Sequence, residues 1–373
     1  MKYFDFASTT PVHPEVQETY RKVLQKYYVN SESLYPEGLE VNKLISKSRR
    51  QVADLLRVNP NEIIFTSGAS ESNNMAIKGY CLKNRDKGHH VITTVIEHSS
   101  VLNSYKWLAE YCGFEVSWLK VNEEGKISID ELKSLIRDDT ILVSVMYVNN
   151  ESGAIQPLEE VKQVVKGYRN CALHVDCVQA LGKIDIDLKG IDMASFSAHK
   201  IYGIKGSGIL YKKQSILMAP LISGGVQEQG LRGGTVDSCA AMLWGKTLRL
   251  ALSDMDKKNE LVRQYHDYMV EELRKMDDIV INSPADGLPY IINFSCLSIQ
   301  SEVMMNALHM KGYCVSAQST CESNIAVSHV ISRMFRDEKR LKGTIRVSLS
   351  ATLSWQDVRG FIADLKEIIR IYG

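Results

Sequence analysis

The chain has almost no excess of charge of either sign. It carries 45 Lys and Arg against 44 Asp and Glu, which gives a formal net charge of +1 over 373 residues. Proteins that bind nucleic acid or an anionic membrane through charge need a basic excess. From the composition we therefore expect no direct contact with nucleic acid and no contact with a membrane.

Long apolar runs are also missing. No stretch approaches the roughly 20 apolar residues of a membrane-spanning helix, and the opening MKYFDFASTT lacks the apolar core of a secretion signal. Hydrophobic residues make up 45% of the chain and charged residues 24%, as in ordinary soluble globular proteins. These features predict a cytoplasmic protein.

Paired cysteines are absent too. None of the eight Cys belongs to a CxxC pair with metal-ligand spacing, so we expect no metal site. Most lie in apolar surroundings, as Cys171 does in CALHV and Cys296 in INFSC. Seven of them are therefore expected to be reduced and buried, as in cytosolic proteins. Cys321 stands in a polar stretch and is considered separately.

Apolar, β-branched runs alternate with helical patterns through the first two-thirds of the chain. The expected strands lie at 90–96, 115–121, 141–148, 172–176, 193–198 and 206–211. Several are continuous apolar runs, which is typical of strands that are covered on both faces. The alternation predicts an α/β domain around a mainly parallel sheet.

The last third of the chain has a different pattern. One long helical stretch over 238–276 is followed by short strands and a closing helix. This predicts a smaller α+β domain. We expect the large domain at 13–255 and the small domain at 256–373, with residues 1–12 able to pack on either.

Two charged residues stand where buried strands are expected to end. Lys200, in SFSAHKIYGIKGSG, follows an apolar run, and Asp176 closes the apolar run of LHVDCVQA. Ligands of α/β proteins collect at the carboxyl ends of strands, so both side chains are expected to face one site. The alternative is a surface-loop lysine and a helix-capping aspartate.

A third motif, FTSGASESNN at 65–74, joins a strand to a helix through small residues. Such a turn leaves backbone N–H groups free to bind a phosphate, although any capped helix can look the same. A lysine that can form a Schiff base, a carboxylate that can pair with a pyridinium nitrogen and a phosphate site together describe pyridoxal 5'-phosphate (PLP).

With these motifs the sequence resembles the cysteine desulfurases, in the class V aminotransferase group with PLP fold type I. The resemblance covers nearly the whole chain. The matching segments are DFASTTPVHPEV, FTSGASESNN, EHSSVL, VNNESGAIQP, HVDCVQALGKIDID, SFSAHKIYGIKGSGILY, QEQGLRGGT and TIRVSLS. It implies an α/β large domain with a mainly parallel sheet and a smaller α+β C-terminal domain.

The resemblance also implies roles at the cofactor ring. Lys200 would hold PLP as a Schiff base and then move protons at the substrate Cα. Asp176 would pair with the pyridine nitrogen, and Gln179 would hydrogen-bond the phenolic oxygen. His98 would stack on the ring and assist proton transfer. Taken alone, His98 fits a satisfied polar group at a strand end equally well.

Further roles concern the two ends of the site. The residues implied in binding the cofactor phosphate are Ala69, Ser70, Ser197 and His199. Thr235 would reach the phosphate from the other subunit, which implies a homodimer. Asn150 and Arg346 would bind the substrate carboxylate, for which the arginine fork is well suited. Without the resemblance, a structural ion pair would be the better explanation of Arg346.

Cys321 lies among Ser, Thr, Asn and Gln in SAQSTCESN, which predicts a mobile polar loop. By resemblance, its thiolate would attack the sulfur of the substrate L-cysteine, and the enzyme persulfide would form as alanine leaves. An iron–sulfur scaffold or a tRNA-thiolation enzyme would accept the sulfur. The alternative is a buried structural cysteine.

Three functions therefore compete. The first is a PLP-dependent cysteine desulfurase, and the second is a related PLP enzyme such as a selenocysteine lyase or an aminotransferase. The third is a non-enzymatic scaffold of the same fold, which the full set of site residues argues against. The chain departs from the usual family residues at Phe6, Tyr35, Gly233, Gln318 and Thr320. None of these changes removes a catalytic group.

Overall fold

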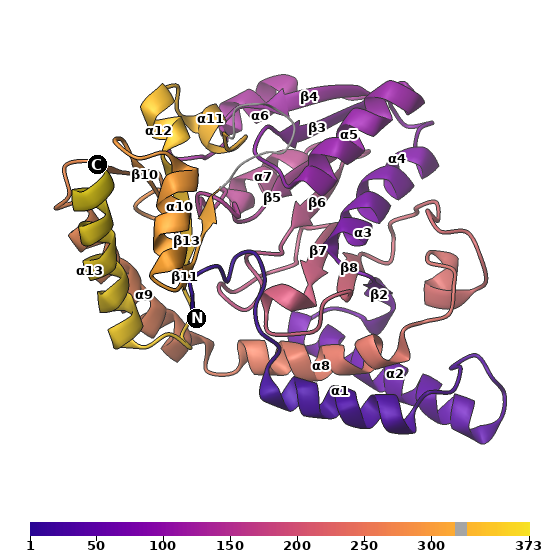
Figure 1. The fold of residues 1–373 in the computed structure, drawn as a ribbon. Helices are drawn as coiled ribbons and strands as arrows, with labels where there is room; N and C mark the ends of the chain where they lie inside the picture. Colours follow the sequence, from indigo (N-terminus) through magenta and orange to yellow (C-terminus); the bar gives the residue numbers. More distant parts are fainter. Residues whose placement is uncertain (318–326) are drawn as a thin grey trace.

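A seven-stranded sheet is the centre of the molecule in the computed structural model, which describes residues 1–317 and 327–373 (Figure 1). Its strand order is β2-β8-β7-β6-β5-β3-β4. The strands are β2 (Ile63–Thr66), β3 (His90–Thr94), β4 (Glu115–Leu119), β5 (Thr140–Met146), β6 (Ala172–Asp176), β7 (Met193–Ser197) and β8 (Gly208–Lys212). Of these, only β8 runs against its neighbours, which confirms the mainly parallel sheet.

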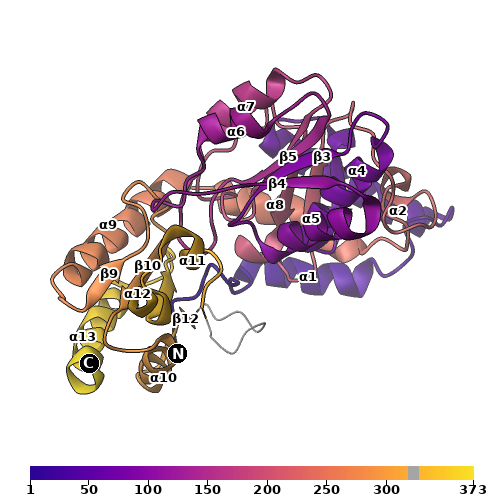
Figure 2. The ribbon, with the colours of Figure 1, turned by 90° about the horizontal axis from the view of Figure 1, so that it is seen from above.

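Helices cover both faces of this sheet, and Figure 2 shows α6 and α7 on one face and α5 on the other. The helices of this part are α1 (Pro14–Lys26), α2 (Pro36–Leu56), α3 (Ala69–Asn74), α4 (Tyr80–Lys83), α5 (Ser99–Cys112), α6 (Ile129–Leu135), α7 (Leu158–Lys166) and α8 (Ser238–Leu252). Neighbouring strand residues alternate between two cores: Ile209 and Tyr211 pack in one, Leu210 in the other. Both faces are buried, which explains the continuous apolar runs.

The helical stretch predicted over 238–276 is two helices rather than one. The helix α8 ends at Leu252, and α9 (Met255–Leu273) begins after a break. Asp254 has a φ of 51° in the left-handed region, which a continuous helix does not permit. The domain boundary near residue 255 stays a prediction.

The C-terminal part is built on an antiparallel sheet of order β12-β13-β10-β9. Its strands are β9 (Ile279–Ile281), β10 (Ile291–Cys296), β12 (Ser316–Ala317) and β13 (Thr344–Ser348), and its helices α10 (Ser301–Met310), α11 (Ile331–Met334), α12 (Glu338–Lys342) and α13 (Trp355–Tyr372). The side chain of Ser354 and that of Asp357 form a capping box that starts α13. None of the helices among the described residues is both long and apolar enough to cross a membrane.

The N-terminal segment contacts both parts of the chain and contributes to a third, two-stranded sheet. Its strand β1 (Lys2–Tyr3) pairs in parallel with β11 (Tyr313–Cys314) of the C-terminal part. Further along, the Thr10 N–H donates to the His199 carbonyl at 2.9 Å, next to the large sheet. The residues between these contacts therefore lie where the two parts of the chain meet.

Candidate active site

A cavity of about 730 Å³ lies at the carboxyl ends of the parallel strands. The segments that follow the strands of the large sheet provide most of its wall, and Ser316 of β12 and Arg346 of β13 come from the C-terminal sheet. The sequence-predicted residues that line it are Ala69, Ser70, His98, Asn150, Asp176, Gln179, Ser197, His199, Lys200 and Arg346. Parallel strands bring their carboxyl ends to one edge of a sheet, which explains why residues so far apart in the sequence converge here.

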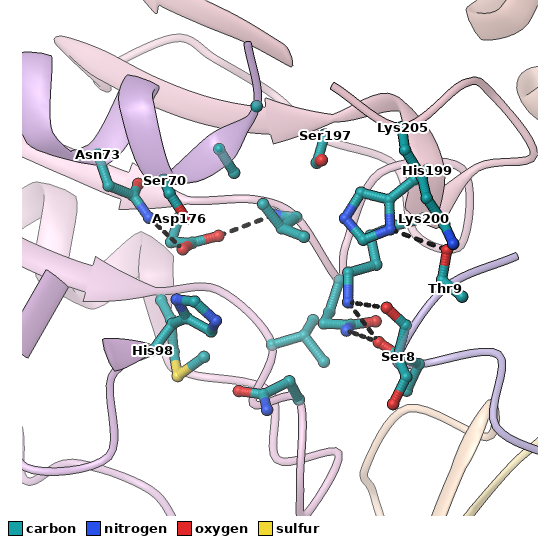
Figure 3. A pocket seen from close by; sticks show the side chains of 18 of the residues that line it. Ser8, Thr9, Ser70, Asn73, His98, Asp176, Ser197, His199, Lys200 and Lys205 are labelled. Atoms are coloured by element: carbon teal, nitrogen blue, oxygen red, sulfur yellow. Dashed lines mark hydrogen bonds between the residues drawn. The ribbon is translucent and has the colours of Figure 1, made fainter. Parts of the chain in front are cut away.

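Lys200 projects into this cavity from the single turn η3 (Ala198–Lys200) after β7 (Figure 3). Its Nζ donates to the carbonyls of Ala7 at 2.6 Å and Ser8 at 2.7 Å. Burial, helped by the positive charge of Arg346, lowers the pKa of Lys200 from 10.5 to about 8. The amine is therefore partly neutral near neutral pH, which a nucleophile toward a carbonyl requires.

Asp176 ends β6 and is buried. Its Oδ2 accepts a hydrogen bond from Asn73 Nδ2 at 2.8 Å, and its Oδ1 accepts one from the Val178 N–H at 3.0 Å (Figure 3). Asn73 lies in α3, and its Nδ2 also donates to Ser100 at 2.9 Å. The two donors hold the carboxylate in one orientation at the cavity wall.

The turn before α3 has backbone N–H groups that could bind a phosphate. Gly68 stands at the helix N-cap with a φ of 152°, and no side chain caps the first turn. The backbone N–H groups that begin this helical segment are therefore not covered by a capping side chain, which leaves them available to an anion. A Cβ on Gly208 would lie 2.5 Å from Gly68, so glycine is required where β8 passes the turn.

His199 follows β7 and also lines the cavity (Figure 3). Its Nδ1 is 3.1 Å from the Thr9 hydroxyl. Burial and the charges of Lys200 and Lys205 lower the pKa of His199 from 6.5 to about 4, so the ring is neutral at physiological pH. A neutral imidazole keeps one donor and one acceptor, and it adds no charge beside Lys200.

His98 forms the N-cap of α5. Its Nδ1 accepts a hydrogen bond from the Ser100 N–H at 3.2 Å and lies 2.9 Å from the Ser100 hydroxyl. Burial lowers the pKa of His98, Asp176 opposes this, and Lys200 and His329 reinforce it. The ring lines the cavity near Asp176 (Figure 3).

Arg346 is held by contacts that come from distant parts of the chain. Its Nη2 donates to Asp5 Oδ1 at 2.8 Å and to Ser8 Oγ at 2.6 Å, and its Nη1 donates to the Asn150 carbonyl at 2.8 Å. The Arg346 side chain is 3% exposed and that of Asp5 19%. The guanidinium is therefore oriented before any carboxylate arrives.

Comparison of the sequence with known proteins assigns this chain to a family. The model of the class-V aminotransferases matches residues 2–361. A cysteine desulfurase IscS of Dictyoglomus turgidum is 38% identical, with 98% of this chain and 94% of the relative covered. The chain belongs to the cysteine desulfurases of the class-V aminotransferase family. The resemblance inferred from the sequence motifs is confirmed.

Other members agree with this assignment. A cysteine desulfurase IscS of Methanosarcina thermophila is 37% identical over 99% of this chain and 92% of its own. A solved NifS-like protein superposes with a TM-score of 0.94 at 34% identity and covers 100% of both chains. A structure titled SspA in complex with cysteine superposes with a TM-score of 0.82 at 34% identity, over 94% of this chain and 99% of that chain. PLP fold type I is therefore confirmed.

Two residues expected from the cysteine desulfurase motifs do not belong to the described wall of the cavity. Thr235 is exposed in the segment before α8 and is not among the residues that line the cavity of its own chain. Cys321 lies outside the described residues, as do Gln318 and Thr320. The roles of Thr235 and Cys321 stay predictions.

Sequence reasoning missed several residues that hold the site together. Asp5 and Ser8 stand in DFASTT, and Asn73 stands in FTSGASESNN, so all three lay inside motifs that were already singled out. Glu97 precedes His98 and is fully buried, and its Oε1 accepts hydrogen bonds from Thr94 and the Met146 N–H, each at 2.8 Å. All four residues stand inside motifs quoted for the family resemblance, and this was their only signal in the sequence.

Proposed function

We propose that the protein is a PLP-dependent cysteine desulfurase that converts L-cysteine to L-alanine and collects the sulfur as a persulfide on Cys321. One observation carries the proposal: Lys200, Asp176 and Arg346 line the same cavity, and the pKa of the lysine is lowered to about 8. A carbonyl-binding amine, a ring-nitrogen partner and a carboxylate-binding group are the three requirements of PLP chemistry on an amino acid. Relatives named cysteine desulfurase support the same enzyme class.

The residues present fit PLP. The amine of Lys200 would bind the aldehyde carbon, and Asp176 would keep the pyridine nitrogen protonated. His98 would stack on the ring, and the Gln179 amide would donate to the phenolic oxygen. The phosphate would be bound by Ala69, Ser70, Ser197 and His199, and by Thr235 of a second subunit in a homodimer. Bound PLP supplies an electron sink for the bonds of the substrate Cα.

The substrate would be bound by residues of the C-terminal sheet and the N-terminal segment. The carboxylate of L-cysteine would pair with the Arg346 guanidinium near Asn150. Asp5 and Ser8 keep that guanidinium fixed, so little ordering is needed when the substrate binds. Lys200, with its lowered pKa, can accept the proton of the substrate Cα and return it to carbon.

The sulfur step is a transfer between two thiols. The Cys321 thiolate attacks the substrate sulfur, a sulfur–sulfur bond forms and the carbon–sulfur bond breaks. The carbon takes up a proton, so L-cysteine and the enzyme thiol become L-alanine and the enzyme persulfide, with no external oxidant. An iron–sulfur scaffold or a tRNA-thiolation enzyme would then accept the sulfur.

The first test is product release from L-cysteine under reducing conditions, with alanine and sulfide measured together. We expect the wild type to form both in equal amounts and Cys321→Ala to form neither, while the variant keeps the yellow colour of bound PLP. Lys200→Ala should be colourless and inactive. A Cys321→Ala protein as active as the wild type would instead support a selenocysteine lyase or an aminotransferase.

A further inference from the structure

Lys183 is a partly buried lysine beside the candidate active site that the proposed reaction does not use. It lines a small cavity of about 50 Å³, together with Lys200 and Tyr290, next to the main one. Its Nζ lies 5.8 Å from the centre of the Tyr290 ring. Gly182 has a φ of +73°, which turns the chain so that Lys183 returns to the residue four positions before it, Gln179.

No carboxylate among the described residues forms an ion pair with this ammonium. Its hydrogen-bond partner is Gln179, whose Oε1 accepts from Lys183 Nζ at 2.9 Å. Burial and the positive charges of Lys200 and Arg346 lower the pKa of Lys183 from 10.5 to about 7. Burying a lysine without a carboxylate partner costs folding free energy. This cost suggests that the contact with Gln179 has a function.

The contact decides which way the Gln179 amide faces. The two ends of the amide have the same shape, but one accepts hydrogen bonds and the other donates them. Gln179 Nε2 donates to the Ala7 carbonyl at 2.9 Å, and Lys200 Nζ donates to the same carbonyl at 2.6 Å. Turning the amide over would set its oxygen against the Ala7 carbonyl and its N–H groups against the ammonium.

We propose that Lys183 is a positioning residue, which fixes the Gln179 amide so that Nε2 is presented to the phenolic oxygen of bound PLP. The proposal rests on the proposed function. A donor held at that oxygen stabilises its negative charge, so the linkage between Lys200 and PLP releases its proton at a lower pH. Loss of Lys183 frees the amide to turn and raises the pH of that titration.

The test follows the visible absorption of the holoenzyme against pH in a double-mutant cycle. Lys183→Met should move the midpoint upward by about one unit, because one hydrogen bond to a charged oxygen is weakened. In a Gln179→Ala background the same substitution should move it by less than half as much. Lys183→Arg, which keeps the donor and the charge, should restore the wild-type midpoint.

Lys258→Met is the matched control. Lys258 lines the same small cavity, but its Nζ donates to the Leu250 carbonyl at 3.0 Å and not to Gln179. The pH midpoint of the Lys258→Met holoenzyme should equal that of the wild type. A shift caused by Lys258→Met as large as that of Lys183→Met would show that any lost charge suffices, and would overturn the proposal.

Two further outcomes would overturn it while the proposed function stands. One is a holoenzyme that desulfurates L-cysteine but whose midpoint does not change in Lys183→Met. The other is a Lys183→Met shift of the midpoint that is equally large with and without Gln179. Lys183 would then act through its charge alone and not through the Gln179 amide. A wild type that binds no PLP would remove the proposed function and this role together.

Discussion

Arg346 of β13 and Asp5 of the N-terminal segment form an ion pair, with 2.8 Å between Nη2 and Oδ1, although 341 positions separate them in the sequence. The pair ties the C-terminal sheet to the segment that also carries the carbonyls bound by Lys200. The Arg346 side and the Lys200 side of the cavity therefore share one short stretch of backbone, residues 5–8. The consequences of this arrangement can be measured.

Removal of Asp5 should destabilise the fold and weaken substrate binding. Asp5→Ala removes the carboxylate that is paired with the buried Arg346 guanidinium at 2.8 Å, and breaking a buried pair costs about 3–5 kcal/mol of unfolding free energy. The KM for L-cysteine should rise. Asp185→Ala is the control, because its pair with Arg57 is exposed and should contribute less than about 1 kcal/mol. Urea unfolding of the two variants distinguishes them, and equal losses would contradict the prediction.

The lowered pKa of Lys200 should appear in the rate at which the apoenzyme takes up PLP. Only the neutral amine attacks the aldehyde, so the rate should rise with pH through a midpoint of about 8 and then level off. Absorbance of the bound cofactor in stopped-flow mixing follows the reaction. A midpoint near 10.5, the value of an ordinary lysine, would refute burial as the cause of activation.

Glu97 should make stability depend on pH. Burial raises the pKa of the Glu97 carboxyl from 4.5 to about 8, so the fold favours its neutral form. The contribution is fully present below the unfolded pKa and is lost as the pH rises through about 8. Glu97→Gln stays neutral throughout. The unfolding free energy of the wild type relative to Glu97→Gln should therefore fall between pH values of about 5 and about 8, and a difference independent of pH would exclude this explanation.

Asn73 should be needed for tight cofactor binding. Asn73→Ala removes a donor from the buried Asp176 carboxylate, at a cost of about 1–3 kcal/mol, which corresponds to a rise of roughly 5- to 150-fold in the Kd of PLP. Asn74→Ala is a neighbouring control, since the Asn74 amide makes a solvent-exposed hydrogen bond to the Ser70 carbonyl and does not contact Asp176. Equilibrium titration of both apoenzymes with PLP measures the difference. Equal affinities of the two variants would show that Asn73 does not contribute to PLP binding.

The residues that end the parallel strands could be found from the sequence. Asp176 and Lys200 follow apolar runs that predict buried strands, so we expect them at or just after a strand end, and Asp176 ends β6 while Lys200 lies in the turn after β7. Parallel strands bring such ends to one edge by geometry alone. The break at Asp254 could not be found in the same way, because the apolar periodicity continues across the left-handed residue.

The sequence by itself determined the class of fold, the family and the edge of the sheet where the cavity lies, because these depend on local periodicity and on motifs of adjacent residues. The tertiary structure alone decided what orients each group: Asp5 on Arg346, Asn73 on Asp176 and Lys183 on Gln179. Most of these contacts join residues far apart in the chain. They exist because two sheets and the N-terminal segment pack around one cavity, and no local pattern encodes that packing.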